Sequence, residues 1–336
     1  MIMNYQTVFK ESLNTFWRHK SLWIFGIVIT LFGQGEYSFS VNYRESYPAG
    51  QEGFPTMPGS EFLLKFFENP VPYILGFGLL SLVLWVIKSL IAWGAQGALI
   101  CMVDDIDQNG STSFTTGLNG GKKRAFSLTI ISILFALPQI IINLPAIAGG
   151  IWFFSQSIDF YKDMLMGKTP SPQEMQTLFE PLMSNIFLGF ACLFPLICIG
   201  GILGWLLSLL NKVTARIFVL ENLSITDSIK RGWEITRKNL GHVLLNGFIL
   251  VVLGVVFGWI AAIPALAAWV PVARALLHQN WTTSTTIAAI FVGFYFLFVV
   301  LGVGGILTSF NSTLWTKLYK AMVENETIIV SESQAS

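Results

Sequence analysis

The sequence is poor in charged residues for its length. Asp, Glu, Lys and Arg make up 12% of its 336 residues, whereas 53% are hydrophobic. Soluble domains carry about 25% charged residues, so this chain has too little charge to cover a surface that faces water. Its mean hydropathy of +0.63 agrees. The composition excludes an ordinary soluble domain and predicts an all-α, polytopic membrane helix bundle.

An excess of positive charge is also missing. The chain has 20 Lys and Arg residues against 19 Asp and Glu, a formal net charge of +1. Binding to a nucleic-acid phosphate backbone needs a strong basic excess. We therefore expect no nucleic-acid partner, and we expect membrane lipids, together with other membrane proteins, to be the partners.

Cysteine is scarce and catalytic motifs are absent. Cys101, Cys192 and Cys198 all fall within apolar runs, where a thiol behaves as a small hydrophobic group. The sequence contains no H-E-x-x-H or G-x-S-x-G motif, and no cysteine lies beside a histidine. These absences favour a protein without a disulfide, metal site, cofactor or redox role, and one that is not an enzyme.

Long apolar runs are what the chain has in abundance. About 20 helical residues cross a hydrocarbon core of about 30 Å. Spans are predicted near residues 19–35, 71–103, 125–152, 183–211, 242–270 and 286–310. Because Pro138 and Pro145 fall in the third run, we expect that span to kink or to end near Pro145. The spans predict one integral membrane domain over residues 1–322, followed by a disordered cytoplasmic tail over residues 323–336.

Lys and Arg residues are distributed unevenly among the connecting segments. Most lie at the two termini and in the loops after the second and fourth predicted spans, whereas acidic residues are divided almost evenly. The positive-inside rule places the segments rich in Lys and Arg in the cytoplasm. We therefore expect a multi-pass protein of the cell (plasma) membrane with both termini cytoplasmic.

The most basic stretch, residues 211–241, follows the fourth predicted span. Residues 224–227 fit the [ST]-x-x-[DE] capping box, which predicts a helix that begins at Ile225. Ile229 and Trp233 continue an apolar face at intervals of four residues. Cations occupy the other faces, as in a helix that lies in the plane of the lipid headgroups.

Five cations are the candidate lipid-contact or substrate-contact residues. Lys230, Arg231, Arg237 and Lys238 bind anionic lipid on one interpretation and only set the topology on the other. Lys88 lies inside the second predicted span, where a charge is costly. It either binds an anionic lipid or substrate, or extends along the helix to the inner headgroups.

Two other segments have the pattern of interfacial helices. Residues 9–17 place aromatic and aliphatic side chains at the i, i+4, i+7, i+8 spacing, followed by Arg18 and Lys20. Residues 311–320 place apolar side chains every four residues beside cations. Together with the basic central helix, they predict three amphipathic helices on the cytoplasmic side.

A faint internal repeat links some of these segments. The stretches that begin at Ser113 and Ser224 each follow a span by about ten residues and precede a basic cluster. Residues 9–20 resemble the same basic helix followed by a span. Three similar hairpins would form a bundle of three units.

The residues around the central helix also suggest a family. The run ARIFVLENLS (215–224) and the run SIKRGWEITRKN (228–239) resemble the membrane domain found beside some bacterial glycerophosphoryl diester phosphodiesterases and in many other polytopic membrane proteins. FNSTLWTKLY (310–319) looks like that group's closing segment. In those enzymes, the resemblance implies, catalysis belongs to a separate soluble barrel. This sequence contains no such barrel, so phosphodiesterase activity is not expected.

Three classes of function remain. A non-catalytic membrane protein that engages anionic lipid, or acts as a scaffold for membrane partners, accounts for the interfacial helices and the basic inner face. A small-molecule or lipid transporter would use a site formed by helices broken within residues 125–150, at Pro195 and at Pro264. A water-filled cavity lined by Lys88 and Asn143 would support it. The sequence lacks the paired intramembrane charges that usually couple transport. An intramembrane enzyme has the least support.

Overall fold

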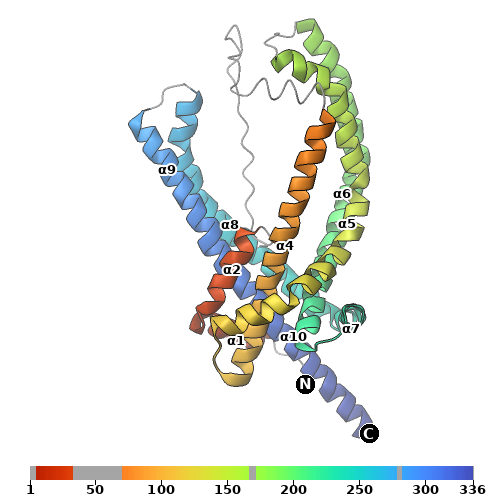
Figure 1. The fold of residues 1–336 in the computed structure, drawn as a ribbon, viewed down its shortest axis with the longest axis vertical. Helices are drawn as coiled ribbons and strands as arrows, with labels where there is room; N and C mark the ends of the chain where they lie inside the picture. The colour runs from red at the N-terminus through yellow and green to blue at the C-terminus, as the bar shows by residue number, and fades with distance from the viewer. Residues whose placement is uncertain (1–4, 33–69, 166–171, 278–281, 336) are drawn as a thin grey trace. The chain divides into compact units, whose positions relative to one another are not determined.

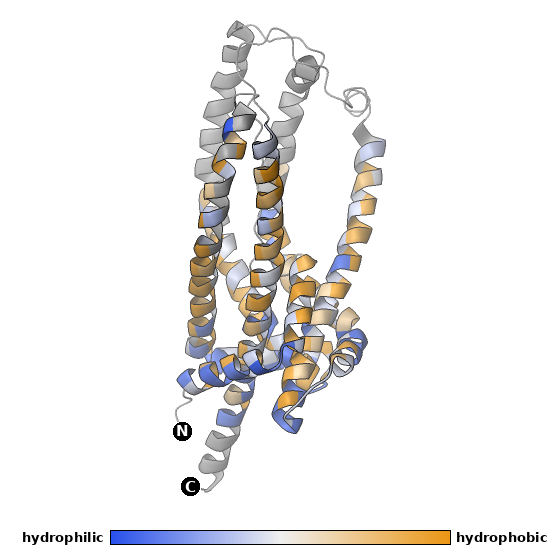
Figure 2. Cartoon of the chain, turned by 90° about the vertical axis from the view of Figure 1, so that its left-hand side faces the viewer, coloured by the Kyte–Doolittle hydropathy of each residue, from blue (hydrophilic) through white to orange (hydrophobic). Residues whose placement is uncertain are grey.

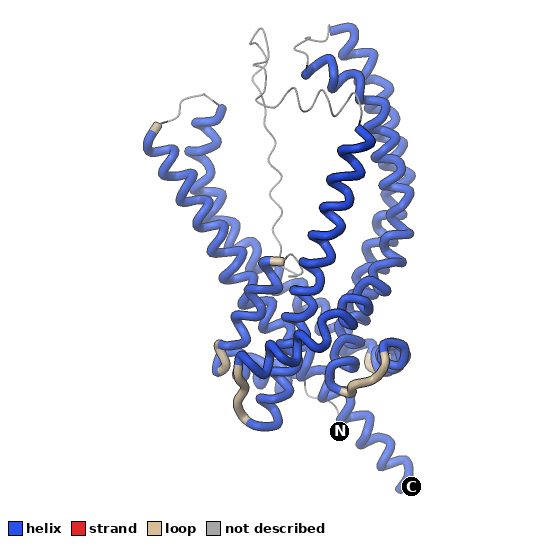
Figure 3. The backbone as a smooth tube through the Cα atoms, in the orientation of Figure 1, coloured by secondary structure: helices blue, strands red, loops and turns tan. Residues whose placement is uncertain are grey.

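The computed structural model describes residues 5–32, 70–165, 172–277 and 282–335. Within these ranges the backbone is helical apart from short turns, and no strand occurs in them (Figure 3). The predicted all-α fold is therefore confirmed.

The helices are named in chain order (Figure 1). They are α1 (Tyr5–Arg18), α2 (Ser21–Leu31), α4 (Pro70–Asn109), α5 (Phe114–Leu165), α6 (Pro172–Leu220), α7 (Ile225–Lys238), α8 (Leu240–Leu277), α9 (Thr283–Phe298), the π-helical turn η1 (Val299–Val303) and α10 (Gly304–Ala335). The chain divides into two compact units: residues 1–44, 86–133 and 208–336 form the first, and residues 45–85 and 134–207 form the second. The candidate site lies in the first unit.

Several helices are suited to cross a membrane. Four are long and apolar enough among the described residues: Leu75–Asn109, Phe114–Pro145, Cys198–Leu220 and Leu240–Ile260. Shorter apolar helices occur at Ser21–Leu31 and Thr283–Tyr295, and Figure 2 shows the apolar residues along these helices. Four of the six predicted spans overlap these long helices, with different bounds. The first and sixth predicted spans overlap the shorter apolar helices.

Helix α5 continues through both of its prolines. Pro138 and Pro145 lie inside it, and it ends only at Leu165. The helix therefore does not end near Pro145, which was one of the two predicted alternatives. Each proline removes one backbone donor, yet the residues on both sides of Pro138 and Pro145 remain helical.

The core of the first unit forms where α2 packs against α4 and α10. Leu22, Phe25 and Ile29 of α2 are buried in one cluster with side chains of α4, including Met102. α2 also approaches α10 closely, because Ser309 Oγ donates a 2.9 Å hydrogen bond to the carbonyl of Leu22.

Helix α10 is central rather than interfacial. Leu314, Trp315 and Leu318 are all buried, so the prediction that residues 311–320 lie in the headgroup plane is wrong. Polar residues can be buried here because their hydroxyls bond to the carbonyls of the preceding turn. For example, Thr316 Oγ1 lies 2.9 Å from the carbonyl oxygen of Ser312.

The described part of α10 also extends into the predicted tail. Residues 323–335, expected to be disordered, continue the helix as far as Ala335. Glu326 within this segment forms two ion pairs with α7, which attach the start of the segment to the first unit.

The helix pairs α1–α2 and α7–α8 have the same local structure. The first helix of each pair ends at a break, where His19 N donates to the Thr15 carbonyl at 3.1 Å and Asn239 N donates to the Ile235 carbonyl at 3.0 Å. The buried positions have the same spacing. They are Val8, Ser12, Thr15 and Phe16 in α1, and Ser228, Gly232, Ile235 and Thr236 in α7. Two of the three predicted repeats therefore share one structure.

Candidate functional site

The basic helix α7 begins where the sequence predicts. Ser224 precedes it in an extended conformation, and its Oγ accepts a 3.2 Å hydrogen bond from the backbone N–H of Asp227. This bond satisfies one of the free donors of the first turn. Arg237 and Lys238 occupy the last turn, where cations interact favourably with the helix dipole. In Figure 1 α7 is seen nearly end-on while α2 and α8 run up the view, so its axis lies at a steep angle to theirs.

One face of α7 packs closely against α6. A Cβ atom added at Gly232 would lie 2.4 Å from Thr214 Oγ1, closer than real Cβ atoms approach. Ser228 and Ile235 are buried on the same side. Trp233 points away from this packing and is 59% exposed. The helix therefore presents an aromatic side chain outward.

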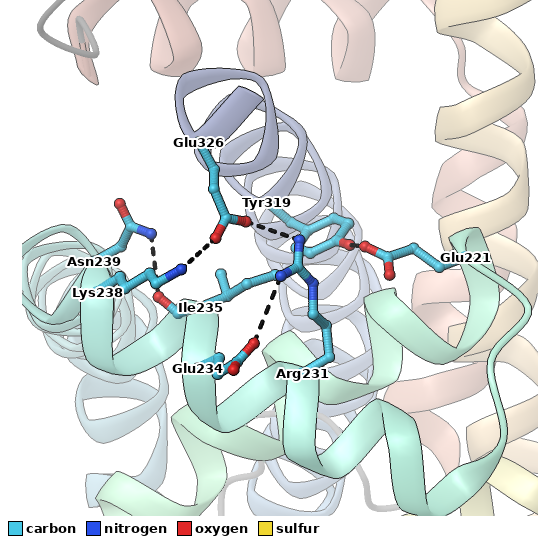
Figure 4. Close-up of polar contacts among 8 residues, drawn as sticks. All are labelled: Glu221, Arg231, Glu234, Ile235, Lys238, Asn239, Tyr319 and Glu326. Atoms are coloured by element: carbon cyan, nitrogen blue, oxygen red, sulfur yellow. Dashed lines mark hydrogen bonds and ion pairs between the residues drawn. The ribbon is translucent and has the colours of Figure 1, made fainter. Parts of the chain in front are cut away.

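Two of the four candidate cations of α7 are paired with α10 (Figure 4). Glu326 Oε2 lies 2.8 Å from Arg231 Nη2, and Glu326 Oε1 lies 2.6 Å from Lys238 Nζ. Arg231 also lies 3.6 Å from Glu234 on its own helix. The hydrogen bond from Lys238, followed by the charge of Arg231, holds the pKa of Glu326 below its usual value. Glu326 is thus ionised at neutral pH and binds α7 to α10.

A second contact in Figure 4 joins α10 to the end of α6. The Tyr319 hydroxyl donates a hydrogen bond to the Glu221 carboxylate. Burial, and then the Glu221 carboxylate, raise the pKa of Tyr319 above its ordinary value. The phenol therefore stays protonated and remains a donor across the neutral range.

A third set of ion pairs joins α10 to the end of α4. Lys317 Nζ lies 2.7 Å from Asp107 Oδ1, and Lys320 Nζ lies 2.7 Å from Asp104 and 2.9 Å from Asp107. Burial alone would lower the pKa of Lys320, but the hydrogen bonds to the two carboxylates outweigh it and raise the pKa. The ends of α4 and α6 and the whole of α7 are therefore attached to one helix.

The other two candidate cations of α7 differ from Arg231 and Lys238 in having no ion-pair partner among the described residues, not in exposure, since the Lys238 side chain is itself 59% exposed. Lys230 and Arg237 are exposed, and neither forms an ion pair within the described ranges. They flank Trp233 in the sequence. An exposed indole between exposed cations suits the interface between acyl chains and anionic headgroups.

Helix α1 presents a similar outer face. Trp17 is 57% exposed, and Lys10 and Arg18 are exposed as well. In Figure 2 α1 runs across the view close to the N-terminus. The Tyr5 hydroxyl donates a 2.7 Å hydrogen bond to Asn246 Oδ1 of α8, which places the start of α1 beside the helix that follows α7.

Lys88 does not join this cluster. It is exposed on α4, about 24 Å along the helix from Asp104 at a rise of 1.5 Å per residue. Arg216, counted among the cations of the cytoplasmic loop, is instead 1% exposed. Its Nη1 donates to the Lys212 carbonyl at 2.7 Å.

The anionic partners on α10 and α4 were not singled out as site residues from the sequence. The signal that could have found the contact between α4 and α10 is the i, i+3 spacing in each helix. This spacing puts two carboxylates on one face of α4 and two ammonium groups on one face of α10. These are Asp104 with Asp107, and Lys317 with Lys320. Across the described residues, no group of three or more His, Cys, Asp or Glu is placed to hold a metal ion.

Comparisons of the chain with family models, curated proteins and solved structures found no match.

Proposed function

We propose that this chain is a non-catalytic protein of the plasma membrane that engages anionic lipid through the outer faces of α1 and α7. The supporting observation is the division of the α7 cations. Arg231 and Lys238 are paired with Glu326, although the Lys238 side chain is itself 59% exposed, whereas Lys230 and Arg237 form no ion pair within the described ranges and lie exposed beside Trp233.

A topology signal alone would not require this division. The positive-inside rule depends on how many cations lie near a span, not on which way each points. The outward pair, Lys230 and Arg237, lies with an indole, a side chain enriched at membrane interfaces. Arg231 and Lys238, here called the inward pair because both bind Glu326, attach α7 to α10, so that the outer face keeps a fixed orientation.

The excess of cations on these segments favours a cytoplasmic location for both termini, α1 and α7. The inner leaflet is rich in anionic lipids. Each Lys or Arg near such a surface contributes about 1 kcal/mol of attraction. Two outward cations would therefore raise the affinity for anionic over neutral lipid about 30-fold.

The test compares two variants that lose the same charge. Lys230→Gln with Arg237→Gln removes the outward pair, and Arg231→Gln with Lys238→Gln removes the inward pair. Native mass spectrometry of protein equilibrated with phosphatidylglycerol and phosphatidylcholine measures the retained lipids.

We expect the outward variant to lose phosphatidylglycerol selectively and to keep its thermal stability. The inward variant should keep the lipid and melt at a lower temperature. Equal lipid retention in the wild type and the outward variant would contradict the proposal, as would equal loss in both variants.

A further inference from the structure

The first turns of α5 repeat the capping geometry of α7. Ser113 Oγ accepts a 3.2 Å hydrogen bond from the backbone N–H of Thr116, as Ser224 Oγ does from Asp227. A residue with positive φ precedes each cap: Gly110 at 73° and Asn222 at 52°. Both links therefore reverse the chain at the end of a span in a similar way, and both lie in the first unit.

The inner face of this segment also matches α7. Gly117 and Gly121 are buried four residues apart, as are Ser228 and Gly232. A Cβ atom on Gly121 would lie 2.2 Å from the Gly94 carbonyl oxygen of α4. The segment thus packs against the span that precedes it, as α7 packs against α6.

The outer face carries cations and aromatic surface. Phe126 is 69% exposed and Leu118 is 49% exposed, and Lys122 and Lys123 are exposed between them. Arg124 points elsewhere, since its Nη2 donates a 2.8 Å hydrogen bond to Asn222 Oδ1. A cation bound within the protein therefore lies next to exposed cations here, as it does in α7.

The segment lies at the same end of the first unit as α7. Arg124 bonds directly to the link before α7, and Phe114 stacks on Phe25 of α2 with ring centroids 5.0 Å apart. In Figure 1 these first turns, drawn in yellow, slant across the lower ends of the neighbouring helices.

We propose that residues 114–126 of α5 form a further contact with anionic lipid, with Lys122 and Lys123 on headgroup phosphates and Phe126 at the acyl boundary. This inference rests on the proposed function. The occupant is a lipid rather than a protein, because exposed cations beside an exposed aromatic ring complement a phosphate layer above acyl chains. Residues 114–126 thus replace residues 311–320 as the proposed third lipid-facing segment.

The first test is native mass spectrometry of Lys122→Gln with Lys123→Gln in phosphatidylglycerol and phosphatidylcholine. The matched control, Lys317→Gln with Lys320→Gln, removes two cations that face carboxylates. We expect the first variant to retain phosphatidylglycerol about 30-fold less tightly, and the control to retain it as the wild type does.

The outcomes separate the two proposals. Unchanged retention in the α5 variant, with loss in the Lys230 and Arg237 variant, overturns the α5 contact and leaves the proposed function standing. Unchanged retention in both variants overturns both.

Photo-crosslinking gives an independent measurement that does not depend on charge. A photoreactive amino acid at position 126 should crosslink to phospholipid in vesicles. The same amino acid at position 128, where Leu128 is fully buried, should not. Crosslinks from position 126 to a second protein, without lipid adducts, would overturn the α5 contact.

Discussion

The close approach of α2 and α10 makes Gly26 a sharp test of the core of the first unit. A Cβ atom at this position would lie 1.9 Å from Ser309 Oγ and 2.2 Å from the carbonyl oxygen of Gly305. The serine side chain can rotate, but the carbonyl belongs to the backbone of α10. The helices must therefore separate by about 1 Å to reach an ordinary contact near 3.4 Å.

The change in the free energy of unfolding for Gly26→Ala combines two destabilising effects and one stabilising effect. Overpacking a tight interface costs about 1–3 kcal/mol. Separation also breaks the 2.9 Å hydrogen bond from Ser309 Oγ to the Leu22 carbonyl, which contributes about 1 kcal/mol. Alanine is better than glycine in a helix by about 1 kcal/mol. The net loss is about 1–3 kcal/mol, a fall of about 2–6 °C in apparent Tm.

The assay is thermal unfolding of purified protein in detergent, followed by intrinsic tryptophan fluorescence at one fixed scan rate. Gly293→Ala is the matched control, since a Cβ atom there meets nothing within 4 Å and only helix propensity changes. Its Tm should stay the same or rise by about 2 °C. Equal Tm values for the two variants would refute the packing of α2 on α10.

Two further predictions concern polar contacts of α10 and α1. The pKa of Glu326 is held below its ordinary value of 4.5, first by the hydrogen bond from Lys238. Its contribution to stability is thus complete above pH 4.5 and is lost as the pH falls through the lower folded-state pKa. Glu326→Gln should lower the Tm at pH 7, and the Tm of the variant should fall less steeply than that of the wild type below pH 4.5. Parallel curves of Tm against pH for the two proteins would contradict this. Tyr5→Phe should cost about 1–3 kcal/mol, because Asn246 is buried and loses its 2.7 Å donor. Burial raises the pKa of Tyr5 from 10.0 to about 12, so the wild type should lose more stability above pH 10 than the variant, in which the raised pKa of Tyr319 still acts. Melts of both proteins from pH 7 to 11 would show the difference.

Local features of this fold could be predicted from neighbouring residues. The start of α7 follows from the capping box at Ser224, because the serine and its partner Asp227 are three residues apart. The amphipathic pattern of α1 and α7 follows from the spacing of their side chains.

Contacts between distant segments could not be predicted in this way. The division of the α7 cations depends on Glu326, and Arg231 and Glu326 are 95 residues apart. Lys317 and its partner Asp107 are 210 residues apart. Residues 311–320 were misplaced for a similar reason: their periodicity suits a headgroup helix, but their hydroxyls are satisfied within α10 and by Gln96, whose Nε2 lies 3.0 Å from Ser312 Oγ.

The π-helical turn Val299–Val303 determines the direction in which the side chains of α10 point. Such a turn accommodates one extra residue, which rotates the downstream side chains by about 100° relative to an uninterrupted α-helix. Ser312 and Lys317 lie beyond it, facing Gln96 and Asp107. Deleting one residue from the turn would restore an α-helical turn and keep these polar groups toward their partners, whereas inserting one more residue would rotate them away by about 100°. This apolar segment therefore tolerates the loss of one residue within the turn better than the gain of one.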